Sequence, residues 1–541
     1  MITDFIVFSV PINTITHFNN EGIWRIIVSD KREYMAYTRT ENVALNTITR
    51  TMASVILILL NFWSRSVFFS SLGQDLLGIN SLFPDVRKIR DFTDLGFSTV
   101  LMVSMYEPIA NHDHAKIHSL LELSKVVYRW VMLAIAVFGL LSIPILRFVN
   151  TDISFTEMII YYIPFLLNKI LSYLWAYRET YLDACQKHYK LFFADIFQAA
   201  GSIIVRTLVL MWFGSYMGYI LVMICFTVVK KLSFNHIIKK ECPEVIYDHA
   251  EPVDKQTKDS IIAKSKAMMV QKFSTLGISQ TDSFIVSVVL NSSTWAIVSN
   301  YNLIKSSITT LLNGIIHAVI PSMGNLMNSE GQEKQMSVFY QYDFINNWIY
   351  ILFFAELFPL VNMVITIIFS DKMLMKPYEI FIFFLSLYLQ GFLSPINVMR
   401  ESSGMFEKDQ WVSIVACLSN LVTSVVFIKI YGLVGVFYGT IISTVVFMVF
   451  RVLIYFNNYA DKKHIWPYYM TVIKTIEVCM VTVGATYAVY SHFLASRFTG
   501  FFGLIINGVI LLCVYLVMFV ALSFRNPNFY AFMNRLRSFI H

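Results

Sequence analysis

Two apolar stretches of similar pattern decide how this chain folds: GYILVMICFTVV at residues 218–229 and GVFYGTIISTVV at residues 435–446. Each begins with glycine and ends with Thr-Val-Val, and the two lie 217 residues apart. Each belongs to an apolar run of about 20 residues, the length that crosses the hydrocarbon layer of a bilayer. We therefore expect membrane-spanning helices that recur at a fixed interval along the chain.

The same interval of 217 residues relates charged positions inside other apolar runs. Arg65 corresponds to Asp282, and Lys88 corresponds to Lys305. A repeat of this kind predicts two parallel helical bundles of like topology, and transporters built in this way hold their substrate between the two halves. Charges inside these runs are candidates for that site, because a charge in hydrocarbon is costly and is usually functional.

The composition is that of an integral membrane protein. Of 541 residues, 56% are hydrophobic and only 14% are charged, and the mean hydropathy is +0.60. A soluble globular domain contains fewer apolar and more charged residues. We expect an all-α integral membrane protein with about 14 transmembrane helices, at residues 45–67, 79–107, 127–148, 157–177, 192–213, 217–238, 268–289, 296–320, 346–369, 378–399, 411–431, 434–456, 468–491 and 501–524.

The net charge of +7 does not indicate a nucleic-acid partner, because the basic residues concentrate in alternate loops. One side carries the stretch from Lys230 to Lys272 and the basic C-terminal tail, whereas loops on the other side, such as Asn291 to Thr294, carry almost no Lys or Arg. The positive-inside rule places the basic side, and with it both termini, in the cytoplasm. The six cysteines form no CxxC pair, so we expect no metal site.

The longest polar segment divides the chain into two halves. We expect a peripheral N-terminal extension at residues 1–37, an N-terminal lobe of six helices at 38–240, a cytoplasmic linker at 241–266 and a C-terminal lobe of six helices at 267–456. Two further packing helices and a basic tail occupy residues 457–541. The apolar run from Phe5 to Ile15 is too short to cross a membrane. A chain that begins at Met35 is therefore expected to function.

Several short motifs resemble one family in their order and spacing. They are Leu77-Gly78-Ile79-Asn80-Ser81, Asp94-Leu95-Gly96, Thr281-Asp282, Ser299-Asn300-Tyr301, and Gly435-Val436-Phe437 followed by Gly439-Thr440. In these features the chain resembles the Wzx-type polysaccharide flippases of the multidrug/oligosaccharidyl-lipid/polysaccharide exporter superfamily, in particular those of Gram-positive capsule and exopolysaccharide pathways. The resemblance runs from about Thr38 to Arg451. It departs from the family at the charged run from Pro84 to Asp91, where relatives are mostly apolar or small.

The resemblance implies a fold and a cargo. The implied fold is two pseudo-symmetric six-helix lobes around a central cavity, plus two extra C-terminal helices. The implied cargo is an undecaprenyl-pyrophosphate-linked oligosaccharide, which alternating access moves from the cytoplasmic to the outer leaflet of the bacterial cytoplasmic membrane. The implied partners are the lipid bilayer, this lipid-linked substrate, and the polysaccharide polymerase and glycosyltransferases of the same pathway. No cofactor is implied, beyond coupling to an Na⁺ or H⁺ gradient.

Basic residues are the candidates for binding the pyrophosphate. Arg65 is the strongest, because it lies within the first span and its planar guanidinium binds phosphate oxygens bidentately. The alternative is a structural ion pair with a carboxylate such as Asp94. Lys305 stands alone in an apolar stretch and is expected to face Arg65 across the cavity. A further basic cluster either lines the cavity mouth or extends to lipid headgroups: Arg87, Lys88 and Arg90.

Other side chains are candidates for ion coupling and for sugar stacking. Asp282 either binds a proton or Na⁺, or forms a salt bridge within its lobe. Asp94 and His317 are further candidates for coupling, although a hydrogen-bonded packing histidine is the more common case. Three aromatic residues are candidates for stacking on sugar rings, with anchoring at the membrane interface as the alternative: Tyr106, Tyr301 and Trp348.

Two other functions compete with the flippase interpretation. An ion-coupled multidrug antiporter shares the superfamily fold, but its cavity is expected to be acidic, whereas Arg65 and Lys305 make this one basic. A polytopic polysaccharide polymerase or glycosyltransferase needs a sizeable loop with paired carboxylates, which the sequence lacks. The chain also has no P-loop, HExxH or GxSxG motif, so direct ATP hydrolysis is not expected. The sequence therefore favours a transporter over an enzyme.

Overall fold

The computed structural model of the protein is helical throughout the part it describes. It describes residues 39–89, 97–149, 151–185, 187–245, 252–259, 261–262, 265, 281–329, 331–402, 410–458 and 461–540. Within these ranges the chain forms α-helices joined by short turns, and it contains no strand. The expected extension at residues 1–37 lies outside the described residues, together with the start at Met35 and much of the expected linker.

The helices follow the chain in three groups. The first half contains α2 (Arg39–Ile89), α3 (Phe97–Ala110), α4 (His114–Leu141), α5 (Ile143–Leu146), α6 (Phe155–Ser172), α7 (Ala176–Ala184), α8 (Phe192–Phe213) and α9 (Tyr216–Glu241). The second half contains a helical segment at 281–289, α11 (Ser292–Ser329), α12 (Gln332–Ile368), α13 (Pro377–Phe392), α14 (Ser394–Ser402), α15 (Gln410–Tyr431) and α16 (Val434–Asn458). The chain ends with α17 (Ile465–Val489), α18 (Gly500–Ser523) and α19 (Pro527–Ile540).

The described residues contain 10 helices long and apolar enough to cross a membrane, or up to 11 if the bent pair of α6 and α7 counts as one span. The protein is therefore an all-helical membrane protein with about 10 to 11 candidate spans. This is fewer than the expected 14. Two of the expected spans, at 79–107 and 268–289, lie partly outside the described residues.

The connection between the spans expected at 45–67 and 79–107 is shorter than those bounds imply. The chain is helical on both sides of Gly73, which alone interrupts α2 with φ 81° and ψ −176°. A positive φ is strained for residues with a Cβ and easily adopted by glycine, so one residue suffices to redirect the chain. The polar residues Gln74 and Asp75 therefore follow immediately after the break, at the start of a new helical segment.

Local sequence signals close the hairpin between α8 and α9. Gly214 ends α8 in the left-handed conformation, with φ 59°. The Ser215 hydroxyl then accepts a hydrogen bond from the Gly218 N–H at 3.1 Å and caps the first turn of α9. Glycine after a helix end and serine before a helix start are the residues that favour these caps. The two spans were expected at 192–213 and 217–238, within a few residues of the observed helices.

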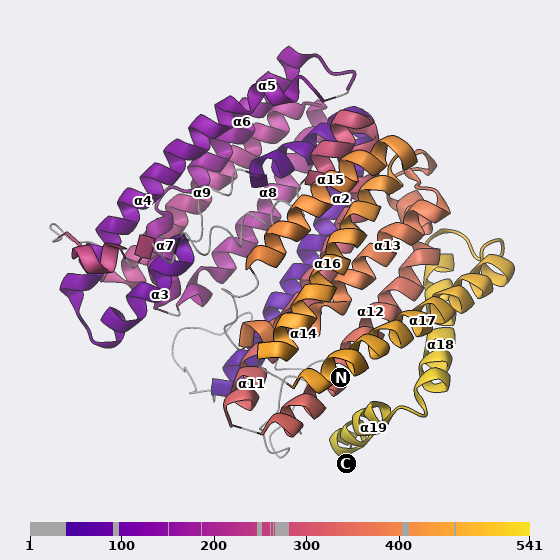
Figure 1. Ribbon diagram of the computed structural model, residues 1–541. Helices are drawn as coiled ribbons and strands as arrows, with labels where there is room; N and C mark the ends of the chain where they lie inside the picture. Colours follow the sequence, from indigo (N-terminus) through magenta and orange to yellow (C-terminus); the bar gives the residue numbers. More distant parts are fainter. Residues whose placement is uncertain are drawn as a thin grey trace, which may run out of the picture.

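The helices gather in two groups. Figure 1 shows α4, α5, α6 and α9 on one side, and α12, α13, α16 and α17 on the other. The last two helices lie at the outer edge of the second group, where Phe529 of α19 packs edge to face on Phe519 of α18 with ring centroids 5.4 Å apart. Part of the expected basic tail is thus helical and packed against the last span.

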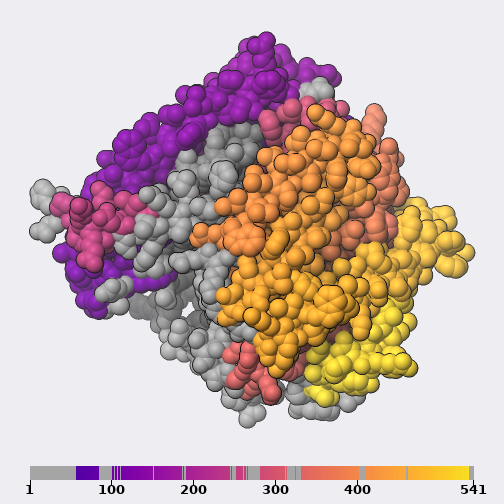
Figure 2. Space-filling view, in the orientation of Figure 1, coloured from indigo at the N-terminus to yellow at the C-terminus, as the bar shows by residue number. Residues whose placement is uncertain are grey.

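The outer surface of α15 is apolar. Leu418, Val422, Val426 and Ile430 recur every four residues and are 56%, 59%, 47% and 64% exposed. Figure 2 shows the orange surface of α15 and α16 on the outer face of the molecule. A stripe of apolar side chains facing outward, over a helical backbone whose hydrogen bonds are satisfied internally, suits hydrocarbon as the surrounding solvent.

Glycine residues bring α15 and α16 close together. A Cβ on Gly435 would lie 2.2 Å from the backbone of Phe427, and one on Gly439 would lie 2.0 Å from the hydroxyl oxygen of Ser424. Small residues four positions apart let two membrane helices approach in this way. The glycine pair therefore fixes the position of α16, which carries Thr440 into the site described below.

Gly435→Ala is expected to destabilise the protein by about 1–3 kcal/mol, because the added methyl group meets backbone atoms that cannot rotate away. The measurement is the thermal unfolding temperature of the purified protein in detergent. Gly484→Ala in α17 is the matched control, since nothing lies within 4 Å of the added Cβ there. Equal unfolding temperatures for the two variants would contradict the close packing of α15 on α16.

Candidate functional site

Arg65 lies at a contact between the two halves of the chain. Its guanidinium donates hydrogen bonds to the side-chain oxygens of Ser299 and Asn300 on α11, and to Ser81 Oγ on α2 at 2.9 Å. Asn300 is fully buried. A charged group inside a membrane protein is stabilised by such hydrogen bonds, because water is scarce there. Arg65 therefore ties α2 to α11.

Further polar side chains extend this contact from Arg65 to the helix break at Gly73. The Asp75 carboxylate accepts hydrogen bonds from the hydroxyl of Ser292, at 3.3 Å, and from that of Ser293. The Gln74 amide donates to the carbonyl oxygen of Ser293 at 3.0 Å. We name this set the polar contact, and it comprises Arg65, Gln74, Asp75, Ser81, Ser292, Ser293, Ser299 and Asn300.

Several hydrogen bonds of the polar contact join residues separated by nearly the repeat interval. Asp75 and Ser292 are 217 positions apart. Ser81 and Ser299 are 218 positions apart and bond at 3.2 Å, while Gln74 and its partner are separated by 219. Residues meet their own counterparts only near a two-fold axis. A parallel repeat of 217 residues with α2 and α11 beside its two-fold axis would bring such pairs together, and the repeat itself stays a prediction.

The backbones of the two helices nearly touch at Gly78. A Cβ at this position would lie 2.1 Å from the carbonyl oxygen of Ser292. Any side chain at position 78 would push α2 and α11 apart, so glycine is what permits the polar contact to form. The contact thus combines hydrogen bonds with close backbone approach.

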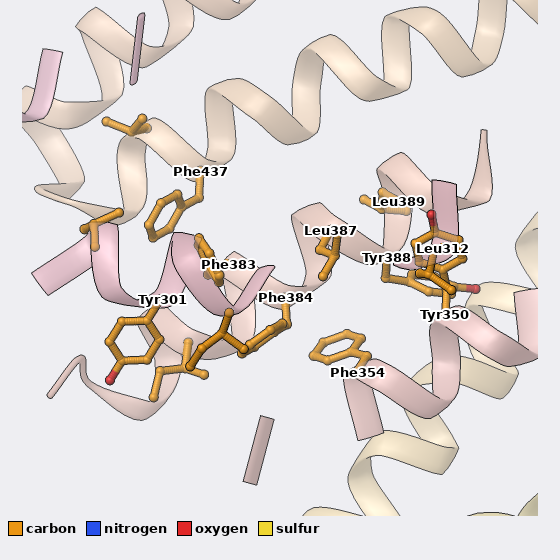
Figure 3. Packing of buried hydrophobic residues seen from close by; sticks show 14 of the residues in the cluster. Tyr301, Leu312, Tyr350, Phe354, Phe383, Phe384, Leu387, Tyr388, Leu389 and Phe437 are labelled. Carbon is orange, nitrogen blue, oxygen red and sulfur yellow. The ribbon is translucent and has the colours of Figure 1, made fainter. Parts of the chain in front are cut away.

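A second polar site lies within the second half of the chain. It is a cavity of about 20 Å³, room for one water molecule. Its charged lining residues are Asp282 and Lys305. The Lys305 ammonium lies 5.4 Å from the ring centroid of Phe383, a cation–π distance. Figure 3 shows Phe383 and Phe437 side by side, and their ring centroids are 5.2 Å apart. The remaining lining residues are Val286, Trp295, Val298, Asn302, Ser386, Val436 and Thr440.

A chain of hydrogen bonds holds the Asp282 carboxylate. The Thr440 hydroxyl donates to Oδ2 of Asp282 at 3.2 Å. The Asn420 amide lies 3.5 Å from Thr440 Oγ1, and its carbonyl oxygen accepts from the Thr281 hydroxyl at 3.3 Å. The other carboxylate oxygen, Oδ1, is buried without a hydrogen-bond partner. An unsatisfied buried carboxylate oxygen in a structure calls for an explanation, such as a water, a proton or an ion.

The structure places Arg65 and Lys305 at different sites, instead of opposite one another as expected. Arg65 contacts Ser299 and Asn300, whereas Lys305 borders the cavity together with Asp282. Lys305 lies five positions after Asn300 on α11, which turns its side chain by about 140° around the helix. The same helix thus serves the polar contact on one face and the cavity on another.

The three aromatic candidates have different surroundings. The buried Tyr301 hydroxyl donates to the Asn362 side chain and accepts from the Met375 N–H at 2.9 Å. Trp348 is only 7% exposed and packs edge to face on Phe519, at 4.9 Å. Both are core residues in this structure rather than surfaces open to a sugar. Tyr106 on α3 is 42% exposed, and its role in stacking stays a prediction.

Five further candidates lie outside what the structure describes. Residues Arg90 and Asp94 fall in the undescribed segment after α2, and the side chains of Arg87, Lys88 and His317 are not described either. The proposed roles of these residues in the cavity mouth and in ion coupling stay predictions.

Sequence reasoning missed most of the polar contact. Asp75 received no role, although the repeat interval maps it directly onto Ser292, and both follow a break in a helix. The interval was thus the signal that finds this pair. Asn420 was missed and Thr440, although part of the motif Gly439-Thr440, received no role, since the two lie 20 positions apart on two helices and no local pattern joins them.

Trp348→Ala is expected to lower the free energy of unfolding by about 3–5 kcal/mol, because a large buried ring is lost between α12 and α18. Trp348→Phe retains a ring and should recover part of this loss. The measurement is thermal unfolding in detergent. A sugar-stacking role predicts the opposite, namely normal stability with reduced transport.

The fold defines the class of protein: a multi-pass, all-helical membrane protein. No family model and no curated protein matches the chain. Solved structures do match. The lipid II flippase MurJ, in an inward closed conformation, aligns with a TM-score of 0.65 and 15% identity, over 88% of this chain and 99% of the flippase.

Two transporters of the MATE family align with lower TM-scores. The inward-facing conformation of a MATE transporter of the MOP superfamily gives a TM-score of 0.58 and 12% identity, over 74% of this chain and 97% of that one. A Vibrio cholerae MATE transporter gives a TM-score of 0.52 and 13% identity, over 80% of this chain and 100% of that one. The chain thus shares its fold with these MurJ and MATE structures.

Proposed function

We propose that this protein translocates undecaprenyl-pyrophosphate-linked oligosaccharide repeat units from the cytoplasmic to the outer leaflet of the bacterial cytoplasmic membrane, for capsule or exopolysaccharide biosynthesis. The observation that carries the proposal is the guanidinium of Arg65 at the contact between the two halves. A cation between the halves attracts an anionic pyrophosphate, and it repels a cationic drug. In this proposal the protein has about 14 spans, as two six-helix lobes and two extra helices.

The extent of the structural match supports a lipid-linked cargo over a small drug. The lipid II flippase aligns over 88% of this chain, whereas the two MATE transporters align over 74% and 80%. MurJ is a lipid II flippase, so its cargo is a lipid. A flippase moves its cargo without breaking bonds, so a transporter role without enzymatic chemistry belongs to the same proposal.

The polar contact acts as the gate on the outer side in this proposal. The positive-inside rule places the connection at Asn291 to Thr294 on the outer side, and Ser292 and Ser293 of the polar contact belong to it. With this gate closed, the substrate enters from the cytoplasm. Alternating access then requires the hydrogen bonds between α2 and α11 to break, and the pyrophosphate to compete for Arg65.

The test is transport in liposomes that contain the purified protein and a fluorescent undecaprenyl-pyrophosphate oligosaccharide. A membrane-impermeant quencher reports how much of the lipid reaches the outer leaflet. The proposal expects the protein to speed this appearance over protein-free liposomes, and to leave a cationic dye untransported. Proton- or Na⁺-driven dye movement without movement of the lipid would overturn it in favour of a multidrug antiporter. Conversion of the lipid to a longer polymer would indicate a polymerase.

A further inference from the structure

Asp282 and Lys305 carry opposite charges on the wall of one small cavity. The cavity has room for about one water molecule, all of its lining residues belong to the second half of the chain, and none of them belongs to the polar contact. Asp282 comes from the helical segment at 281–289 and Lys305 from α11. A buried charge is tolerated in a membrane when an opposite charge offsets it.

The oxygen atoms around this cavity are of the kind that binds a small hard cation. Thr440 donates to one carboxylate oxygen of Asp282, and the other carboxylate oxygen is buried and lacks a hydrogen-bond partner. Asn302 and Ser386 add an amide and a hydroxyl to the lining. Carboxylate, amide and hydroxyl oxygens are preferred ligands for hard cations. Without Lys305, this arrangement would resemble an empty cation site.

We propose that Lys305 is the resident cation of this site: its ammonium neutralises Asp282 and thereby excludes Na⁺. Two positive charges in one small buried cavity repel each other strongly, because little water is present to screen them. The Phe383 ring beside the ammonium adds a cation–π contact that holds it in place. The protein then needs no free Na⁺ at this site for its conformational cycle. This inference removes Na⁺ at this site as a coupling ion of the proposed transporter, and it rests on that function only for its role in transport.

The first experiment measures cation binding, which does not depend on transport activity. The thermal unfolding temperature of the purified protein is compared in NaCl and in choline chloride at equal ionic strength. The wild-type protein should show no difference. Lys305→Met removes the ammonium and retains an unbranched side chain of the same length up to Cε. NaCl should therefore raise the unfolding temperature of this variant by about 2 °C or more. The double variant Asp282→Asn with Lys305→Met should lose this response.

A double-mutant cycle guards against a variant that fails to fold. Lys305→Met and Asp282→Asn each leave an unpaired buried charge, whereas the double variant leaves none. The double variant should therefore unfold at a higher temperature than either single variant in choline chloride. Failure of Lys305→Met alone to accumulate in the membrane, with recovery in the double variant, would also support the pairing.

Two results would overturn the inference. One is a rise in the unfolding temperature of the wild-type protein in NaCl that disappears in Asp282→Asn. The other is a folded Lys305→Met protein that shows no response to NaCl. Because these measurements use no substrate, they separate this inference from the flippase proposal. If the protein moves no lipid-linked oligosaccharide but the Lys305→Met variant gains Na⁺ binding, only the flippase proposal is refuted.

Discussion

Arg65→Ala is expected to reduce polysaccharide export by about 100-fold or more, at a normal level of inserted protein. The substitution removes three charge-assisted hydrogen bonds, two of them from α2 to α11 and one to Ser81 within α2. In the proposed function it also removes the cation that receives the pyrophosphate. Each bond to a charged group contributes about 1.5–3 kcal/mol, and about 1.4 kcal/mol corresponds to a factor of ten. The variant is expressed in a strain in which the wild-type gene is repressed. The measurement is the amount of lipid-linked intermediate that accumulates on the cytoplasmic side of the membrane.

Arg65→Lys separates charge from geometry. Lysine retains the positive charge but cannot bond Ser81 and Asn300 with the two ends of a planar fork, so it should retain part of the export. Arg206→Ala is the matched control, since Arg206 is an arginine within α8 that lies over the Tyr219 ring, at 5.0 Å, and takes no part in the polar contact. Normal export by Arg65→Ala would mean that the substrate is held elsewhere.

Gly78→Ala is expected to abolish most transport, because it prevents α2 and α11 from closing. The added Cβ would lie 2.1 Å from the Ser292 carbonyl oxygen, so the helices must separate and the hydrogen bonds of Asp75 must lengthen. Overpacking of this kind costs about 1–3 kcal/mol. It destabilises only the closed state of the gate, because the helices are apart in the open state. The gate should then stay partly open on the outer side.

The measurement for Gly78→Ala has two parts. Export is measured in the repressed strain, and accessibility of the outer side is measured by labelling a cysteine placed at Ser293 with a membrane-impermeant reagent. Labelling should increase in the Gly78→Ala background. Gly508→Ala in α18 is the control, because its added Cβ makes only an ordinary contact of 3.8 Å, with Leu360. Unchanged labelling together with normal export would show that the close approach has no role in gating.

The repeat interval of 217 residues indicated contacts between the two halves as well as the pair Arg65 and Asp282 that it was first used to identify. It related Arg65 to Asp282, two charged residues inside apolar segments of different helices. In the structure, however, the interval appears most directly in contacts between counterparts, such as Asp75 with Ser292. A chain position and its counterpart meet only next to the axis. The interval alone does not state which helices are next to that axis.

The sequence by itself determined the class of protein and the bounds of many helices. The run expected at 192–213 is α8, and those expected at 411–431 and 434–456 agree with α15 and α16 to within two residues. Such bounds follow from local sequence, because the thickness of the hydrocarbon layer sets the length of each apolar run and glycine or serine marks its ends.

Only the tertiary structure decided which side chains meet. Lys305 borders Asp282 instead of Arg65, and Tyr301 and Trp348 lie in the core instead of facing a cavity. The physical reason is that the partner of an intramembrane side chain depends on the rotation of its helix and on which neighbours pack beside it. A sequence in which nearly every face of a helix is apolar leaves both of these open, since the hydrocarbon and the protein core attract the same side chains.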